Sequence, residues 1–193
     1  MAHVLNPELL RRAYANGYFP MPHPDTGEIL WFRPDPRAII PLEGFHRSKS
    51  LQKTLRKKYF EATYDLAFND VMKACADREE GTWITQEFLE VYGELHAQGD
   101  AHSVEIWYDG KLAGGVYGVT VGGAFFAESK FHSITDASKV ALHFLVERLR
   151  EKHFQLLEVQ FMTPHLATLG AVEVTDDDYQ RLLVKAVKTR TVF

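Results

Sequence analysis

The chain has 193 residues, of which 46% are hydrophobic and 12% are aromatic. This is enough apolar material for a sizeable core that needs no disulfide or metal to hold it together. The formal net charge of −4 and the charged fraction of 25% are typical of a globular protein and exclude a disordered or collagen-like chain. No apolar run approaches the roughly 18 residues of a membrane helix, and the N-terminus has no signal-peptide pattern. A lone Cys75 permits no internal disulfide, which agrees with a reducing compartment. Together with the missing membrane helix and signal pattern, this leads us to expect a cytoplasmic protein that has no membrane partner.

The first half of the chain predicts helices and one proline-rich loop. Leu9, Leu10 and Ala13 share a helical face, which predicts a helix over Pro7–Asn16. Four of the eight prolines lie between residues 20 and 34 and predict a rigid loop. Further helices are predicted from apolar residues at helical spacing over His46–Lys58, 64–78 and 85–98. We divide the chain into a short N-terminal segment, residues 1–32, and a main domain, residues 33–193.

The second half changes to a period of two. Alternation in Ser103–Tyr108 and the β-branched run Leu112–Val119, joined by Asp109-Gly110, predict a hairpin. The remaining predicted elements are a strand at Ala124–Glu128, a helix at Thr135–Lys152 capped by Thr135 or Asp136, a strand at Gln155–Phe161, a short helix at Pro164–Leu169, a strand at Val172–Val174 and a helix at Asp177–Val187. This order predicts an α+β fold with a mixed sheet.

Two polar residues share one face of the strand expected at Gln155–Phe161. Glu158 and Gln160 are two positions apart, so their side chains point the same way, about 6.5 Å from each other. The strand lies between two helical connections, where sheets are covered on both faces, and a covered carboxylate needs partners. A carboxylate beside an amide can hold an amine and steer its proton. The same pattern also fits an exposed sheet face.

A third polar residue follows an apolar run. Glu128 comes directly after Phe125–Ala127, where an acid is usually solvated. Alternation along the strand nevertheless places Glu128 on a defined sheet face, together with Phe126 and Lys130.

Basic residues gather in the helix predicted at His46–Lys58, where no acid stands among them. They include Arg47, Lys49, Lys53, Arg56 and Lys57. Such a run is either a solvated helix face or a site for a polyanion, and its isolation in a net-acidic chain favours the polyanion. Trp83 has two similar interpretations, a core residue or a platform on which an unpaired base stacks.

Several common chemistries are excluded. The glycines of Gly114–Gly118 lie inside a strand pattern with no helix after it, so they form neither a dinucleotide fingerprint nor a P-loop. The chain has no His-Glu-x-x-His motif and no Gly-x-Ser-x-Gly elbow. We therefore do not expect a metal enzyme or a serine hydrolase.

Five motifs, in order along nearly the whole chain, resemble the bacterial leucyl/phenylalanyl-tRNA-protein transferases. They are Trp31-Phe32-Arg33-Pro34-Asp35-Pro36-Arg37-Ala38, Glu79-Glu80-Gly81-Thr82-Trp83-Ile84-Thr85, Leu95-His96 with Ala101-His102-Ser103-Val104-Glu105-Ile106-Trp107, Phe126-Ala127-Glu128-Ser129 with Ala137-Ser138-Lys139, and Thr168-Leu169-Gly170-Ala171. The resemblance implies a GNAT-like domain that takes Leu or Phe from aminoacyl-tRNA. The acceptor is a protein N-terminus that begins with Arg or Lys, and the product is marked for degradation in the N-degron pathway. The resemblance implies no coenzyme A, metal or ATP.

The same resemblance implies roles for individual residues. Gln160 with Glu158 orients the acceptor amine and helps to deprotonate it, Glu128 takes part in acceptor or ribose recognition, and Trp83 lies against the terminal adenosine. The positions implied to bind substrate also include Val116, Phe125, Ser129, Lys130 and Leu142, and those implied to bind the acceptor stem of the tRNA are Arg47, Lys49, Lys53, Arg56 and Lys57.

Departures from the family pattern leave open which amino acid the donor tRNA carries. Met21-Pro22 stands where the family has Trp-Phe, Glu158 where it has Asp, Asp136 where it has Asn, and Lys130 where an apolar residue lines the amino-acid pocket. A lysine in an apolar pocket must pair with an acid or reach water. One alternative is therefore an Asp or Glu donor, and the other is a Lys130 that passes the pocket and meets a phosphate or Glu128.

Two other functions compete with this interpretation. An acyl-CoA-dependent acetyltransferase needs a glycine-rich pyrophosphate loop between a strand and a helix, which the sequence lacks. A non-catalytic RNA-binding domain would bind tRNA and form no amide.

Overall fold

The computed structural model describes residues 5–23, 25–77 and 81–193. Its main sheet contains β3 (Arg37–Ile39), β4 (Phe60–Tyr64), β5 (Ala101–Tyr108), β6 (Lys111–Val121), β7 (Ala124–His132), β8 (Leu156–Gln160) and β9 (Val172–Val174). The strand order is β4-β5-β6-β7-β8-β3-β9. Neighbouring strands are antiparallel except β7 and β8, which are parallel. The predicted α+β class with a mixed sheet is confirmed.

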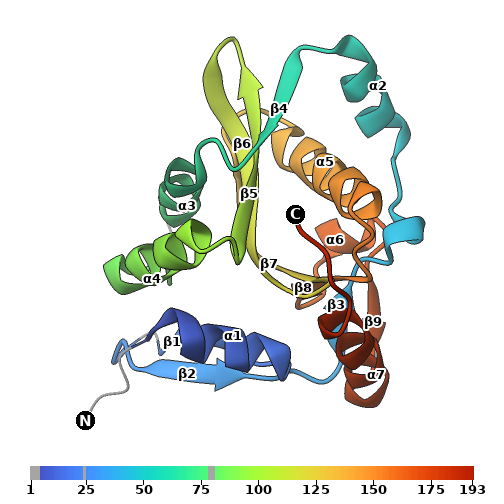
Figure 1. The fold of residues 1–193 in the computed structure, drawn as a ribbon. Coiled ribbons are helices and arrows are strands. Elements are labelled where there is room, and N and C mark those ends of the chain that lie inside the picture. The colour runs from blue at the N-terminus through green and yellow to red at the C-terminus, as the bar shows by residue number, and fades with distance from the viewer. Residues whose placement is uncertain (1–4, 24, 78–80) are drawn as a thin grey trace.

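Helices cover both faces of this sheet (Figure 1). The helices are α1 (Pro7–Ala15), α2 (Lys49–Lys57), α3 (Phe68–Ala76), α4 (Gln86–Ala97), α5 (Ala137–Glu151), α6 (Pro164–Ala167) and α7 (Asp176–Val187), with a 3₁₀ turn, η1, at Leu42–Gly44. Helices α3 and α4 pack on one face, where α1 and α7 join the same core, whereas α5 covers the other face and α2 packs against α5. No helix in the described ranges is long and apolar enough to cross a membrane.

The two core layers follow from strand alternation. Phe126 and Tyr117 are buried on the side of α3 and α4, whereas Phe125 and Val116 are buried on the side of α5. Successive side chains of a strand point to opposite faces, so the apolar runs of β6 and β7 supply both layers at once. The predicted turn at Asp109-Gly110 is confirmed, because both residues have positive φ, 50° and 68°.

The proline-rich segment is not the loop that we predicted. It contains the hairpin of β1 (Phe19–Pro22) and β2 (Ile29–Phe32), paired from Phe19 opposite Phe32 to Pro22 opposite Ile29. A two-stranded hairpin leaves one edge of each strand unpaired, so prolines are tolerated where their missing N–H would face outward. Pro24 lies outside the described residues.

The prediction also missed two short strands. Strand β4 occupies residues before the helix expected at 64–78, so α3 begins later, at Phe68, and residue 78 lies outside the described residues. The residues of β3 overlap the first motif, but we did not predict a strand there. Strands of three to five residues give only a weak periodic signal, and the pairing partners of β3 and β4, which are β5, β8 and β9, lie far along the chain.

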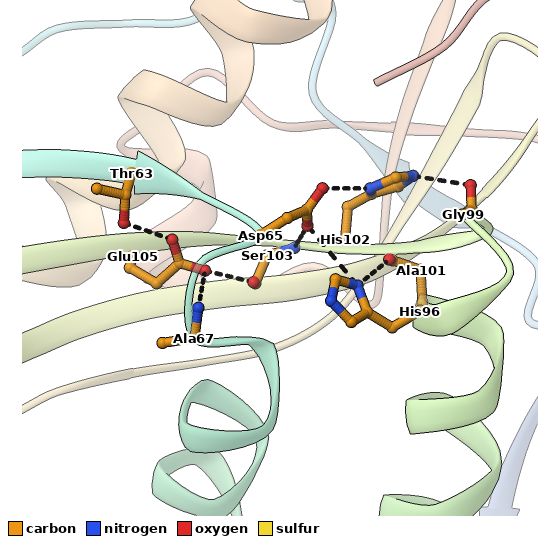
Figure 2. Close-up of polar contacts among 9 residues, drawn as sticks. All are labelled: Thr63, Asp65, Ala67, His96, Gly99, Ala101, His102, Ser103 and Glu105. Carbon is orange, nitrogen blue, oxygen red and sulfur yellow. Dashed lines mark hydrogen bonds and ion pairs between the residues drawn. The ribbon is translucent and has the colours of Figure 1, made fainter.

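A buried polar cluster ties β4 to β5 and to the start of α3 (Figure 2). Glu105 is fully buried and accepts hydrogen bonds from Thr63 Oγ1 at 2.6 Å, from Ser103 Oγ and from the backbone N–H of Ala67 at 3.5 Å. Trp107 Nε1 donates to Thr63 Oγ1 at 2.7 Å. A buried carboxylate is tolerated because these donors replace water.

The cluster continues to Asp65 and two histidines, as Figure 2 shows. His102 Nδ1 lies 2.8 Å from Asp65 Oδ2 and its Nε2 lies 3.1 Å from the carbonyl oxygen of Gly99. His96 Nδ1 lies 2.8 Å from the carbonyl oxygen of Ala101. The motif residues from Leu95 to Trp107 therefore include the side chains that hold this edge of the sheet.

We predict that Glu105→Ala lowers the free energy of unfolding by about 2 kcal/mol or more, since it leaves buried donors without their acceptor. Urea denaturation measures the loss. The matched control is Glu61→Ala, an exposed position on β4, for which we expect a change within about 0.5 kcal/mol. Equal losses at both positions would contradict a structural role for the cluster.

Candidate active site

The parallel strands β7 and β8 separate after a short paired stretch. They are paired only over Ala124–Phe126 and Leu156–Glu158. Beyond this point β7 continues along β6 and β8 continues along β3. Ligands of α/β sheets commonly bind at the carboxyl ends of strands that diverge in this way. The opening between β7 and β8 is therefore a candidate ligand site.

A β-bulge lies in β7 at this opening. Ala127 is paired with Gly118 and Ser129 is paired with Tyr117, so Glu128 is an extra residue on β7. Bulges bend a strand and change the direction of a side chain, often beside functional sites.

The bulge reverses the alternation of β7 beyond Glu128. Lys130 is paired with Val116, whose side chain belongs to the core layer under α5. Cross-strand partners share a face, so Lys130 lies on the α5 side. Glu128 instead bonds Tyr14 and Tyr92, which belong to the other layer. The prediction that Glu128 and Lys130 share a face is wrong, because the inserted residue shifts the register.

Glu128 is the centre of a buried hydrogen-bond network. Tyr14 from α1 donates to its Oε1 at 2.7 Å, Tyr92 from α4 donates to its Oε2 at 3.5 Å, and Gln160 Nε2 from β8 donates to Oε1 at 3.1 Å. The two tyrosine hydroxyls lie 2.5 Å apart. Sequence reasoning missed both tyrosines, because each lies on the apolar face of a helix. The only signal was that a buried tyrosine hydroxyl needs a partner.

This environment changes the acidity of Glu128. Burial raises the pKa of its carboxyl from 4.5 to about 8; the charge of Glu158 adds to this rise, and the hydrogen bonds from Tyr14, Gln160 and Tyr92 oppose it. A carboxyl group with this pKa exchanges a proton near neutral pH, which is what a general acid or base requires.

Glu158 has a different environment. Its Oε1 accepts from Arg37 Nη1 and its Oε2 accepts from the hydroxyl of Tyr179, and its side chain is 1% exposed. Arg37 also donates to the carbonyl oxygen of Gly17 at 2.6 Å. Burial raises the pKa of Glu158, whereas Arg37 and Tyr179 favour its ionised form. Both oxygens are thus engaged inside the protein. Sequence reasoning did not assign a role to Arg37, although it lies in the first motif.

The two residues predicted to act as a pair bind different partners. Glu158 bonds Arg37 and Tyr179, whereas Gln160 bonds Glu128. Gln160 is the last residue of β8 and has φ of 64°. This left-handed conformation costs a residue other than glycine about 1 kcal/mol, and such strain gathers at functional sites.

A cavity of about 410 Å³ opens beside Glu128. Its lining residues are Trp83, Glu128, Ser129, Lys130, His132, Ser138 and His165. Trp83 is partly exposed, and its ring packs edge-on against Phe88 at 5.3 Å. The structure therefore brings together four positions that the resemblance implied, Trp83, Glu128, Ser129 and Lys130, and it adds His132, Ser138 and His165, which sequence reasoning left aside.

Three other positions that were predicted to bind substrate lie in the core instead of the cavity lining. Val116, Phe125 and Leu142 are at most 1% exposed and belong to the core layer between the sheet and α5. Their predicted contact with the aminoacyl side chain stays a prediction. Within the described residues, no group of His, Cys, Asp and Glu is placed to hold a metal ion.

The basic residues lie apart from this cavity, on and before α2. Helix α2 begins after Ser48, whose Oγ accepts from the N–H of Leu51 at 3.2 Å, and it buries Leu51 and Thr54. Its basic side chains face solvent; they are Lys49, Lys53, Arg56 and Lys57, and Arg47 precedes the helix. The predicted helix is confirmed with a later start, and the basic surface that it carries is exposed.

We predict that wild-type stability falls relative to that of Glu128→Gln as pH rises from about 5 to 8. Between the ordinary pKa of 4.5 and the folded value of about 8, the folded protein keeps a proton that the unfolded chain has released. Urea denaturation across this pH range measures the difference. Exposed Glu94→Gln on α4 is the control and should keep the wild-type slope. A slope that survives in Glu128→Gln would assign it to another group.

Comparison with known proteins identifies the family of the chain. The model of the "Leucyl/phenylalanyl-tRNA protein transferase" family matches residues 39–184, and the model of that family's N-terminal domain matches residues 4–35. A leucyl/phenylalanyl-tRNA–protein transferase from Herpetosiphon aurantiacus is 55% identical over 194 residues and covers 100% of both chains. A protein of the same name from Salinibacter ruber is 50% identical over 187 residues, which cover 97% of this chain and 82% of the relative.

The solved structures that match the chain have low sequence identity to it. A ribosomal-protein-alanine N-acetyltransferase from Brucella melitensis matches with a TM-score of 0.39 and 14% identity over 54% of this chain and 81% of the other. The L-PGS structure from Bacillus licheniformis matches with a TM-score of 0.45 and 12% identity over 83% of this chain and 55% of the other. The family models and the full-length relatives show that the chain belongs to the leucyl/phenylalanyl-tRNA protein transferase family.

Proposed function

We propose that this chain transfers Leu or Phe from the 3′ end of aminoacyl-tRNA to the α-amine of proteins that begin with Arg or Lys. The product would enter the N-degron pathway in the cytoplasm, where charged tRNA is available. Membership of the family supports the reaction class. The observation that carries the proposal is the Glu128–Gln160 pair at the opening between β7 and β8, beside a cavity that contains Trp83.

The reaction needs little more than positioning. The aminoacyl ester is already activated, so the acceptor nitrogen attacks its carbonyl carbon, an amide bond forms, and the ester bond to the ribose oxygen breaks. One proton leaves the amine and one is taken up by the ribose oxygen. Holding the two substrates together and moving that proton supply most of the rate gain.

Glu128 is suited to take the proton from the amine. The ammonium form of an α-amine has a pKa of about 7.7–8.0, and the pKa of Glu128 is raised to about 8, so transfer of a proton from the ammonium to Glu128 is nearly balanced. The proton that the amine then loses as the amide forms goes to the ribose oxygen. Gln160 cannot act as a base, because an amide is not protonated near neutral pH. It donates to Glu128 through its nitrogen, which leaves its carbonyl oxygen as an acceptor for the amine.

Glu158 acts in this proposal as a positioning residue. Its bonds to Arg37 and Tyr179 hold the end of β8, two residues before Gln160. Trp83 supplies a face for the terminal adenine, and a base that stacks on an aromatic ring gains about 1–3 kcal/mol. The basic surface of α2 would contact phosphates of the acceptor stem.

One assay tests the reaction against its competitors. An Arg-initiated peptide is incubated with charged tRNAs and with acetyl-CoA, and mass spectrometry records what the peptide gains. We expect the mass of a Leu or Phe residue from charged tRNA. A gain of an acetyl group, or tRNA binding without any mass gained, would overturn the proposal in favour of an acetyltransferase or an RNA-binding domain.

In the same assay, Gln160→Ala should slow transfer by at least about tenfold, because removal of a positioning group commonly costs roughly 10² or more. Gln155→Ala is the matched control, since this exposed glutamine precedes β8 and its side-chain amide donates to carbonyl oxygens of its own loop. Full activity of a folded Gln160→Ala protein would remove the amide from the site.

We predict that replacing Lys53, Arg56 and Lys57 together with Gln weakens tRNA binding and reduces its salt dependence. Each lost phosphate contact lowers the slope of log affinity against log salt by up to about 0.9. Filter binding at several salt concentrations measures the slope. The control removes equal charge from exposed Arg181, Lys185 and Lys188, on and just after α7. If both triple variants shift the slope equally, the α2 surface has no special role.

A further inference from the structure

One wall of the cavity is made of cationic and donor groups from three elements. Lys130 and His132 come from the end of β7, Ser138 from the first turn of α5, and His165 from α6. Ser138 Oγ lies 3.4 Å from His132 Nδ1. Nothing in the proposed transfer step uses this wall, because the amine and its proton are handled by Glu128 and Gln160.

The bulge in β7 places this wall on the α5 side of the sheet. Lys130 is paired with Val116, and His132 is paired with Gly114. A Cβ built on Gly114 would lie 2.7 Å from the Cβ of Ala137, so this face of the strands directly contacts the start of α5. The opening between β7 and β8 therefore has Glu128 toward one face and the cationic wall toward the other.

The acid next to this wall is held by two other groups. Asp136 lies at the start of α5, but its carboxylate is 2.8 Å from Lys139 Nζ and accepts from Thr54 Oγ1 at 3.1 Å. Burial lowers the pKa of His165, the positive charges of Lys130, Lys139 and His132 lower it further, and the charge of Asp136 opposes this fall. The cations are thus crowded enough to disfavour a further proton, and an anion among them would relieve that repulsion.

The position of Lys130 suits contact with an anion at the mouth of the cavity better than contact with the side chain of the transferred amino acid in the core. Lys130 is partly exposed, whereas Phe125 and Leu142 are sealed at 0% and 1%. The wall also offers donors of three kinds: an ammonium, imidazoles and a hydroxyl. A phosphate group, with several oxygens directed apart, can use donors from separate elements at once.

We propose that Lys130, His132 and His165 form a subsite for the phosphodiester that joins the terminal adenosine to the rest of the tRNA. The inference rests on the proposed function, because it takes the adenosine to lie in the cavity that contains Trp83. The phosphate is bonded to the 5′ oxygen of that adenosine, so an adenosine in the cavity would bring it to the same cavity. Lys130 then helps to bind the 3′ end of the tRNA instead of selecting the amino acid.

The test compares two stable mimics of the donor end, 3′-phenylalanylamino-3′-deoxyadenosine with and without a 5′-phosphate. Binding to the full chain is followed by tryptophan fluorescence and calorimetry, which need no turnover. We expect the phosphate to tighten binding to the wild type by about tenfold. This advantage should fall below about threefold in Lys130→Met and, independently, in His132→Ser. Lys111→Met, at an exposed position at the start of β6, should keep the full advantage.

Two results would overturn the subsite. The first is equal binding of both mimics by the wild type. The second is transfer of Asp or Glu from charged tRNA by the wild type that is lost in Lys130→Met, which would assign the lysine to the donor side chain. The proposed function fails separately, when phosphate tightens binding but the Arg-initiated peptide gains no residue from charged tRNA.

Discussion

The separation of β7 from β8 is the constraint on which the rest of the site depends. These parallel strands share only the pairs from Ala124–Leu156 to Phe126–Glu158, after which each stays with its antiparallel neighbour. The antiparallel ladders satisfy only the backbone groups on the far side of each strand, so the groups that face the opening need other partners. The opening exposes the groups just beyond the last pair. Glu128 follows it on β7 and Gln160 follows it on β8, and the bulge turns Glu128 toward Gln160.

Two buried carboxylates near this opening have different partners, and burial raises the pKa of both. Glu158 faces the guanidinium of Arg37, which compensates its charge. Among the described residues, the donors to Glu128 are hydroxyl and amide groups, so the cost of burying its charge is not repaid and its pKa rises to about 8. Arg37 and Tyr179 thus hold Glu158 and the strand that carries it, whereas Glu128 faces the cavity.

The N-terminal segment is part of this arrangement. Tyr14 on α1 donates to Glu128, and Gly17, just before the β1–β2 hairpin, accepts from Arg37. The ring of Phe19 also lies 5.4 Å from the Arg37 guanidinium. These contacts support the same two carboxylates from outside the main sheet. The division of the chain near residue 32 stays a prediction, whereas the chemistry of the site draws on both sides of that boundary.

The sequence by itself determined the elements whose signals are local and the family to which they belong. Helical spacing located α1, α4 and α5 to within a few residues, Asp109-Gly110 located the β5–β6 turn, and ordered motifs identified the transferase family. The environment of each acid was decided by the tertiary structure. Glu128 meets Tyr14 across 114 positions and Tyr92 across 36, while Glu158 meets Arg37 across 121. Periodicity reports how a segment relates to its own neighbours along the chain. Which distant side chain reaches a carboxylate depends on strand order and on a single inserted residue in β7, and neither leaves a periodic signal.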